Sequence, residues 1–392
     1  MQAGLTRVDG RRCVRQALTA QREAAPVWVA AIGKAAIAMA CGAHEALGAA
    51  IERTLVITRD EDEHGLAELR ARGAAEVWFG AHPVPDERSL EAGARLLEWV
   101  EALPASVQPL FLVSGGSSSL VEVLNPGHTL RDLEELTREA FASGIAIGEL
   151  NARRTALSRI KGGRLAARLK GRAARALFVS DVPHDDPRVI GSGLMGPSSQ
   201  GADHIVRQVV ASVDQAVAAV AARAAELSLT VHACAARFAG DAVRLAARFA
   251  HELSLSSAQL CVWGGESTVQ LPPRPGSGGR NQHLALAVAR LIAGHTDLLL
   301  LAAGTDGSDG VTDDAGALVD ADTCARLALA QLDADHCLQQ ADSARALAAS
   351  GDLVHTGPTG TNVGDLVIGL KLSAPDGRVL ARRHGGSLAR VL

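Results

Sequence analysis

Short apolar runs alternate along the chain with longer segments whose apolar residues recur at helical spacing. In the first half the runs have the length of strands, and they occupy residues 27–32, 54–58, 75–80, 109–113 and 175–180. The helical pattern covers residues 35–47, 90–102 and 130–143 and an Ala/Val-rich segment over 204–227. Strands that alternate with helices favour a mostly parallel sheet, whose ligand binds at the carboxyl ends of the strands.

A second α/β pattern begins at residues 229–235. Further strands are predicted over 260–263, over 297–304 and within 353–372. Further helices are predicted over 241–253, from Asn281 onward and over 322–330. We therefore expect an α/β protein of two domains, which cover residues 1–228 and 229–392.

Composition excludes several classes of function. Of the 392 residues, 47% are hydrophobic and 21% charged, as in ordinary globular proteins, and the formal net charge of −4 argues against a broad nucleic-acid or anionic-membrane surface. No apolar run approaches the ~20 residues that span a bilayer. The six cysteines are scattered without a CxxC pair. The sequence thus predicts a soluble, cytoplasmic protein with small-molecule ligands.

The densest group of candidate residues lies in the second half. The apolar run 260–263 breaks at Gly264-Gly265, with Glu266 at the break, and a later glycine-rich turn delivers Arg280 and Asn281 to the start of a helix. Backbone amides, the helix dipole and a guanidinium all favour a carboxylate or phosphate. This stretch therefore predicts an anion site.

A cluster of aspartates follows the apolar run 297–304. Asp306 and Asp309 lie among glycines, and two more aspartates follow closely. Acidic oxygens at the end of a buried strand suit a hydrated divalent cation, so Asp306 and Asp309 are candidate metal ligands. The loop is no EF-hand, because the twelfth position from Asp306 is Ala317 instead of Glu.

Lys34 is the first candidate in the first half of the chain. It stands at the turn between the strand 27–32 and the next helix, where an ammonium can meet an anion. The surrounding sequence is no P-loop, because Trp28 occupies the place of the first Gly and Ala35 that of Ser/Thr. A solvated surface lysine remains the alternative interpretation.

The run SGGSSS after the strand 109–113 is the second candidate. Its residues Ser114, Gly115, Gly116 and Ser117 could cradle a phosphate or carboxylate with amides and hydroxyls. A tight turn with helix-capping serines is an equally good interpretation. The nucleophile signature GxSxG is absent, which excludes the usual hydrolase elbow.

Charged residues mark two further stretches. Asn151, Arg153 and Lys161 lie on a basic segment that either binds an anion or forms a solvated helix face. Asp181 follows a predicted strand, as a metal ligand, a base or a turn residue would. Residues 191–196 match GxGxxG, but no strand leads directly into them and no helix follows, so a plain loop is the better interpretation.

Longer motifs run through nearly the whole chain. They are GKAAIAMA (33–40), HPVPDERSLEAG (82–93), LVSGGSSSL (112–120), ELNARRTALSRIKGGRLA (149–166), VSDVPHDDPRVIGSG (179–193), GGESTV (264–269), GGRNQHLALA (278–287), GTDGSDGVTDDAGA (304–317) and TGPTGTNVGDL (356–366). In this order they resemble the glycerate 2-kinase family with a C-terminal MOFRL domain, formerly often labelled hydroxypyruvate reductase.

The resemblance implies ATP-dependent phosphorylation of D-glycerate at its 2-hydroxyl, with Mg²⁺ as the cation. It also implies a Rossmann-like N-terminal domain, a smaller α/β C-terminal domain and an active site in the interdomain cleft. Lys34 and Arg280 match the lysine and arginine that are regarded as essential in the family. Asp181 is then a candidate base or Mg²⁺ ligand, and Glu266 and Asn362 are candidate binding residues in matched motifs.

Departures from the family pattern leave other functions open. Ser117 replaces a third Gly, Ser192-Gly193-Leu194-Met195 stands where the family usually has SGPT, and Gly276-Ser277 stands where a Lys is common. The last two departures could change phosphate contacts or nucleotide preference. One alternative is an NAD(P)H-dependent hydroxypyruvate reductase, which would need a dinucleotide fingerprint. Another is a non-catalytic sensor of a sugar acid. A homodimer is a further hypothesis.

Overall fold

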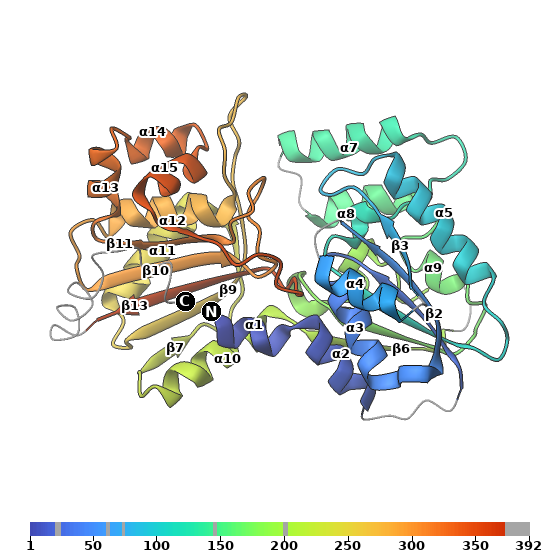
Figure 1. Cartoon of the computed structure of the whole chain (residues 1–392). Helices are drawn as coiled ribbons and strands as arrows, with labels where there is room; N and C mark the ends of the chain where they lie inside the picture. Colours follow the sequence, from blue (N-terminus) through green and yellow to red (C-terminus); the bar gives the residue numbers. More distant parts are fainter. Residues whose placement is uncertain (20–24, 60–62, 73–74, 144–146, 199–202, 373–392) are drawn as a thin grey trace. The chain divides into compact units, whose positions relative to one another are not determined.

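A computed structural model describes residues 1–19, 25–59, 63–72, 75–143, 147–198 and 203–372. Within them the chain forms two compact units (Figure 1). The parallel-sheet unit comprises Val8–Ser212 and Gly360–Val363, and the mixed-sheet unit comprises Met1–Arg7, Val213–Thr359 and Gly364 onward. No helix among these residues is both long and apolar enough to cross a membrane.

The parallel-sheet unit is built on six strands in the order β3-β2-β1-β4-β5-β6. These are β1 (Val27–Ile32), β2 (Ile51–Thr58), β3 (Ala75–Phe79), β4 (Gln108–Ser114), β5 (Ala174–Val179) and β6 (Ile205–Ala211). Every neighbouring pair is parallel. The order reverses between β1 and β4, as in Rossmann-like sheets, and ligands of such sheets bind beyond the carboxyl ends of the strands at this switch point.

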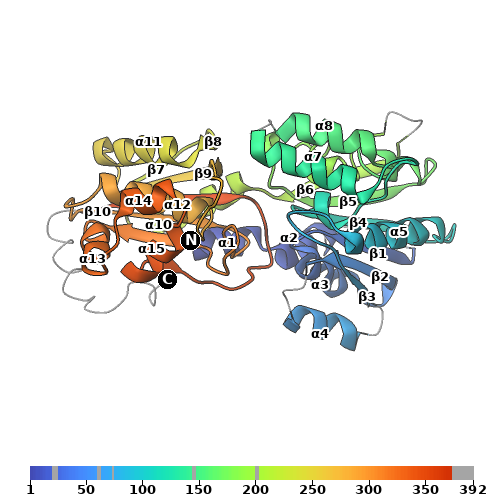
Figure 2. The same cartoon turned by 90° about the horizontal axis from the view of Figure 1, so that it is seen from above.

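Helices cover both faces of this sheet, because buried parallel strands are apolar on both sides. They are α2 (Gly10–Thr19), α3 (Ala36–Leu47), α4 (Glu63–Ala71), α5 (Glu87–Glu101), α6 (Ser117–Leu120), α7 (Leu130–Ser143), α8 (Ile147–Leu157) and α9 (Arg164–Ala167). Figure 2 shows α3 and α4 on one side of the sheet and α7 and α8 on the other. Trp99 of α5 packs against Trp28 and Phe111, with ring centroids 5.7 and 5.9 Å away.

One predicted helix of this region is wrong. The segment 204–227 begins with the strand β6, and α10 (Val213–Glu226) follows only after Ser212. The stretch Ile205–Ala211 contains three valines and an isoleucine, which favour an extended chain, and it pairs with β5 from Ala174 opposite Ile205. Because Ala and Val are frequent in both β6 and α10, composition did not show where the strand spacing gives way to helical spacing.

The mixed-sheet unit holds the second sheet, in the order β12-β11-β10-β13-β9-β7, with β8 beside β9. Its strands are β7 (Val231–Ala233), β8 (Phe238–Asp241), β9 (Leu260–Thr268), β10 (Leu298–Gly304), β11 (Gly316–Asp320), β12 (Leu353–Val354) and β13 (Asp365–Lys371). Strand β13 runs antiparallel to both β10 and β9, whereas β7 and β8 run parallel to β9. The predicted α/β class, with a Rossmann-like sheet and a second α/β unit, is confirmed.

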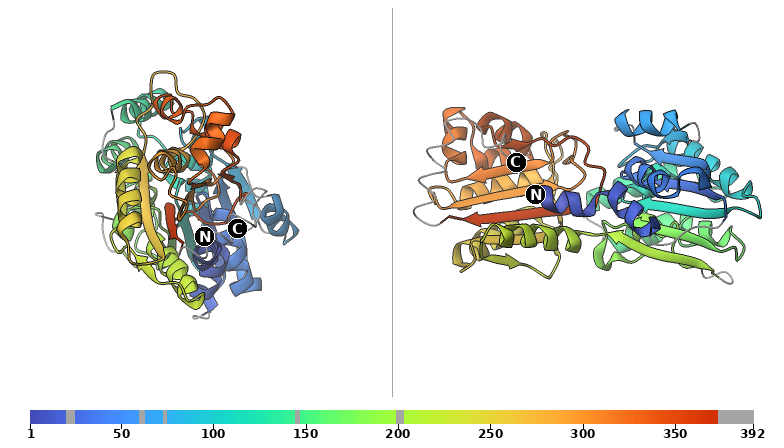
Figure 3. Two further views of the ribbon diagram at one scale, coloured as in Figure 1. Left: turned by 90° about the vertical axis from the view of Figure 1, so that its left-hand side faces the viewer. Right: turned by 60° about the horizontal axis from the view of Figure 1, so that its bottom comes forward.

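Helices also pack on both faces of the mixed sheet (Figure 3). They include α1 (Gln2–Val8), α10, α11 (Ala242–Leu255), α12 (Arg280–Leu291), α13 (Thr323–Leu329), α14 (Ala334–Gln339) and α15 (Ser343–Ser350). Trp263 of β9 points toward α11, where its ring lies 4.8 Å from that of Phe249. The next residue, Gly264, faces α10 so closely that a Cβ would lie 2.6 Å from Val213. Helix α10 therefore packs on this sheet, although the predicted domain boundary falls after it.

The predicted break at Gly264-Gly265 is also wrong, because β9 continues through both glycines to Thr268. Both pair with β13, opposite Leu366 and Asp365. A side chain at Gly265 would meet the Phe238 carbonyl at 2.1 Å, so close neighbours rather than a turn require glycine there. Glu266 consequently lies on a regular strand.

Candidate active site

The turns after β1 and β4 lock together at the switch point of the parallel sheet. The Lys34 amide donates to the Gly115 carbonyl (2.9 Å), and the buried Ser114 hydroxyl accepts from the Ala35 amide (3.0 Å). Gly33 has a φ of 126°, and a Cβ there would lie 2.2 Å from Ser114 Oγ. Ser114 therefore fixes the two turns against each other.

The side chain of Lys34 lies beside the Gly115-Gly116 turn. A Cβ on Gly116 would be 3.0 Å from Lys34 Cγ and 3.3 Å from His82 Cδ2. Both side chains are half-buried. Lys34, Gly115 and Gly116, which were predicted as two separate candidates, are thus adjacent in space. His82, in the turn after β3, was missed as a site residue, although its motif HPVPDERS follows a predicted strand.

Asp181 joins this group from the end of β5. Its carboxylate accepts a hydrogen bond from Asn362 Nδ2 (3.1 Å), and Gly115 packs directly on the pair. A Cβ at Gly115 would lie 1.9 Å from Asp181 Oδ2 and 2.1 Å from Asn362 Nδ2. The glycine at 115 is therefore required by the approach of these two side chains. Sequence spacing could not have paired Asp181 with Asn362.

Lys161 lies in the interior and bonds to the protein itself. Its ammonium donates to Glu122 Oε2 (2.5 Å) and to the Ser118 carbonyl (2.6 Å), and neither side chain of the ion pair is exposed. Burial lowers the pKa of Lys161, and the carboxylate of Glu122 opposes that shift. The expectation of a binding residue or a solvated face did not anticipate a buried pair.

Arg154 is the buried arginine of α8, and sequence reasoning chose its neighbour. Arg154 is 7% exposed, and its guanidinium lies 3.4 Å from Ser118 Oγ, which in turn contacts Ser192 Oγ at 2.5 Å. Burial lowers the pKa of Arg154, and Glu122 opposes that shift. Arg153 points outward and pairs with Glu149 (2.6 Å), as a solvated helix face would.

Two predicted residues of this unit add little to the geometry. Asn151 lies on α8, and its side chain is outside the described part of the structure. Ser117 begins the short helix α6 and is buried, and within the described residues its hydroxyl has no hydrogen-bond partner. A Cβ at Gly191 would lie 2.3 Å from that hydroxyl. Ser117 therefore packs against the 191–193 turn.

In the mixed-sheet unit Arg280 is held by two carboxylates. It is the first residue of α12, and its Nε and Nη2 donate to Asp365 at 2.7 and 3.0 Å, while Nη1 pairs with Glu266. Asp365 is fully buried, whereas the Glu266 side chain is 48% exposed. Burial alone would lower the pKa of Arg280, but the two carboxylates raise it well above its usual value. The guanidinium is therefore permanently charged.

The amino end of α12 is capped by Asp309. Its Oδ1 accepts from the Asn281 amide (3.1 Å) and from Asn281 Nδ2 (3.2 Å), and its Oδ2 accepts from the Gln282 amide (2.7 Å). The anion site predicted here thus receives a carboxylate of the chain. Burial raises the pKa of Asp309 to about 7, while these hydrogen bonds and Arg280 act in the opposite direction.

Asp306 occupies the turn after β10, where its carboxylate accepts from the Ser308 amide (3.1 Å). Among the described residues, no group of three or more His, Cys, Asp and Glu side chains is arranged to hold a metal ion. Mg²⁺ commonly binds through one or two carboxylates together with substrate phosphates, so such a group is not required for it. The assignment of Asp306 and Asp309 as metal ligands stays a prediction.

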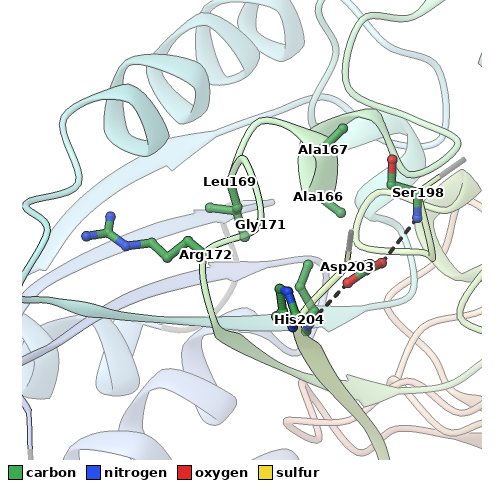
Figure 4. Close-up of a pocket in the computed structure, with 9 residues that line it drawn as sticks. Ala166, Ala167, Leu169, Gly171, Arg172, Ser198, Asp203 and His204 are labelled. Atoms are coloured by element: carbon green, nitrogen blue, oxygen red, sulfur yellow. Dashed lines mark hydrogen bonds between the residues drawn. The ribbon is translucent and has the colours of Figure 1, made fainter. Parts of the chain in front are cut away.

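A small pocket lies near the amino end of β6, whereas the Lys34 turn lies at the carboxyl ends of the strands (Figure 4). Leu169, Arg172 and His204 line it, and Asp203 accepts from the Ser198 and Ile205 amides at 3.2 and 3.1 Å. Ligands of parallel sheets bind at the carboxyl ends of the strands. The Lys34 group is therefore the stronger candidate.

Two family models match the chain. A domain of unknown function, DUF4147, matches residues 1–225, and the MOFRL family matches residues 259–365. A D-glycerate 2-kinase of Thermotoga maritima is 36% identical over 385 residues, which cover 88% of this chain and 90% of that protein. A glycerate 2-kinase of Pyrococcus horikoshii is 29% identical, and the match covers 88% of each chain.

A solved structure is also similar to this chain. The crystal structure of glycerate kinase from Thermotoga maritima aligns with a TM-score of 0.80 and 31% identity, over 95% of this chain and 97% of that one. The likeness therefore extends over both units.

Proposed function

Because the chain belongs to the glycerate 2-kinase family of the DUF4147 and MOFRL type, we propose that it transfers the γ-phosphoryl group of ATP to the 2-hydroxyl of D-glycerate. The observation that carries this proposal is the group at the switch point of the parallel sheet. There the side chain of Lys34, a glycine turn (Gly115-Gly116) and an anchored carboxylate (Asp181) lie together. The products are 2-phosphoglycerate and ADP.

The residues of this group have complementary roles in phosphoryl transfer. The 2-hydroxyl oxygen forms a bond to the γ-phosphorus, the bond to the bridging oxygen of ADP breaks, and the hydroxyl proton passes to Asp181. Lys34 neutralises either the carboxylate of the acceptor or the transferring group. The turn at Gly115 and Gly116 lets backbone amides approach an anion closely, because no side chain intervenes.

Arg280 is proposed as the cation on the transferring phosphoryl group. Its bond to buried Asp365 fixes the guanidinium, while the exposed Glu266 can exchange for an incoming phosphate oxygen. Mg²⁺ neutralises phosphate charge when it is bound with ATP, and Asp306 is the carboxylate proposed to hold it. Both Asp309 oxygens already accept bonds from the first turn of α12, which makes Asp309 the less suitable ligand.

The reductase alternative lacks a supporting observation in the described residues. The turn after β1 is Gly33-Lys34, and the GxGxxG match at 191–196 overlaps a short 3₁₀ turn (Ile190–Ser192) instead of joining a strand to a helix. ³¹P NMR of the product tests the proposal, since it separates the 2- from the 3-phosphate. NADH consumption with hydroxypyruvate alone, without ADP release from glycerate and ATP, would overturn it.

The proposal includes a cytoplasmic location, with a homodimer as a hypothesis. All six cysteines are thiols, which suits the reducing cytoplasm. Light scattering in solution decides whether the protein is a homodimer.

A further inference from the structure

The Lys161–Glu122 pair is the most deeply buried charged feature of the parallel-sheet unit. Both side chains have no exposed area, and Nζ lies 2.5 Å from Glu122 Oε2. The other oxygen of Glu122 accepts from the Ser158 hydroxyl (2.5 Å) and the Val123 amide (2.9 Å). The carboxylate is therefore satisfied on both sides.

Lys161 also bonds a backbone group that the fold leaves without a helical partner. The Ser118 carbonyl belongs to α6, which ends at Leu120 after a single turn. In a longer helix the amide of residue 122 would donate to it, but the Glu122 amide donates to the Ser89 carbonyl instead (3.0 Å). The Lys161 ammonium takes that place at 2.6 Å.

Stability alone does not explain an ion pair at this depth. Taking two charges out of water costs free energy that their attraction seldom exceeds, and uncharged replacements of a buried pair are often as stable. An uncharged side chain without a donor could not bond the Ser118 carbonyl, however. The donor is what distinguishes this pair from ordinary packing.

We propose that Lys161 is a positioning residue, which holds α6 and the preceding glycine turn in place through the Ser118 carbonyl. The turn at Gly115 and Gly116 directly precedes α6 and lies beside Lys34, so a shift of α6 moves the groups proposed to bind the anionic substrates. The catalytic consequence rests on the proposed function, whereas the structural consequence does not. Lys161 therefore acts through the turn, without contacting substrate.

Two variants separate this role from packing. Lys161→Met removes the donor and leaves Glu122 charged and buried, whereas Lys161→Met combined with Glu122→Gln removes both charges and keeps an acceptor for Ser158 and Val123. Lys170→Met is the matched control, since Lys170 is exposed. Hydrogen–deuterium exchange of the peptide 114–121 reports the position of the turn without any substrate. Thermal unfolding and steady-state kinetics with glycerate and ATP complete the set.

In the single variant we expect a lower Tm, faster exchange of residues 114–121 and a kcat about 100-fold lower, as for a reacting group displaced by about 1 Å. In the double variant Tm recovers, while the fast exchange and low kcat persist. Recovery of all three would overturn the proposal, since the pair would then serve packing alone. Unchanged exchange in both variants would overturn it as well. If the wild-type protein fails to phosphorylate glycerate, the exchange result still decides this inference.

Discussion

The side-chain amide of Asn362 donates to the Asp181 carboxylate across 3.1 Å, although 181 positions separate the two residues in the chain. The segment that carries Asn362 is tied to the start of the same unit. The Gly10 amide donates to the Gly360 carbonyl (3.1 Å), and the Thr361 hydroxyl donates to the Val8 carbonyl (2.6 Å). Asp181 is thus oriented by a side chain whose two preceding residues are bonded to the Val8–Gly10 segment.

Removal of that amide should lower turnover. In Asn362→Ala the Asp181 carboxylate loses its orienting donor, and we expect kcat to fall about 10- to 100-fold with little change in KM. Asn362→Asp should be worse, because it places a second carboxylate beside the first. Initial-rate measurements of ADP release decide this. Equal activity of wild type and both variants would contradict the role given to Asp181.

Lys34 should be dispensable for folding and required for turnover. Its side chain is half-buried and not part of the core, so Lys34→Ala should lower the free energy of unfolding by about 1 kcal/mol, as an average substitution does. Loss of a cation that stabilises the transition state should reduce kcat about 10³-fold or more. ADP release and urea denaturation measure the two effects. Lys170→Ala, at an exposed lysine of the same unit, is the control and should keep wild-type rates.

Arg280 should contribute to stability as well as to catalysis. Arg280→Ala leaves Asp365 charged and fully buried, and we expect a loss of roughly 2–4 kcal/mol in the free energy of unfolding. Adding Asp365→Asn should restore much of that loss, because no uncompensated charge then remains, but it should not restore turnover. Chemical denaturation of the single and double variants tests this. A single variant as stable as wild type would contradict the pairing.

Asp309 should make stability decline between about pH 4 and pH 7. Its pKa rises from 3.8 to about 7 in the folded chain, so the folded state binds a proton that the unfolded state has released over this range. The contribution is present below pH 4 and lost as pH rises toward 7, on the order of 4 kcal/mol.

Urea denaturation at several pH values checks this dependence. Asp309→Asn cannot titrate, so its stability should lack this component. Asp313→Asn, at an exposed aspartate nearby, should behave as wild type. Identical pH profiles of Asp309→Asn and wild type would reject the shifted pKa.

Local pattern was sufficient for most of the fold. Each strand of the parallel sheet except β6 was predicted from an apolar run, because buried parallel strands are apolar on both faces. It failed at Ile205–Ala211 and at Gly264-Gly265, where composition resembled a helix and a turn. In both places the segment is a strand because it pairs with a neighbouring strand. The local sequence pattern carries no information about that neighbour.

The types of residue at the candidate site could be predicted from the sequence, but the residues that they contact could not. Lys34, Gly115 and Gly116 were predicted as site residues because they follow apolar strands, and in the structure these strands are neighbours at the switch point. Arg153 was chosen over Arg154 because the basic segment was not resolved into buried and exposed faces. A long-range pair such as Lys161–Glu122 has no local sequence pattern. A lysine that pairs inside the protein therefore cannot be distinguished, from sequence, from a lysine that binds a ligand.

The return of residues 360–363 to the parallel-sheet unit limits how far the protein can be treated as modular. A gene fragment that ends at Ser212 would encode every strand of that sheet but omit Asn362. Hybrids that join the first half of one relative to the second half of another would therefore exchange the residue that orients Asp181. Such chimaeras should lose catalysis when the second parent supplies a residue there that cannot donate to Asp181.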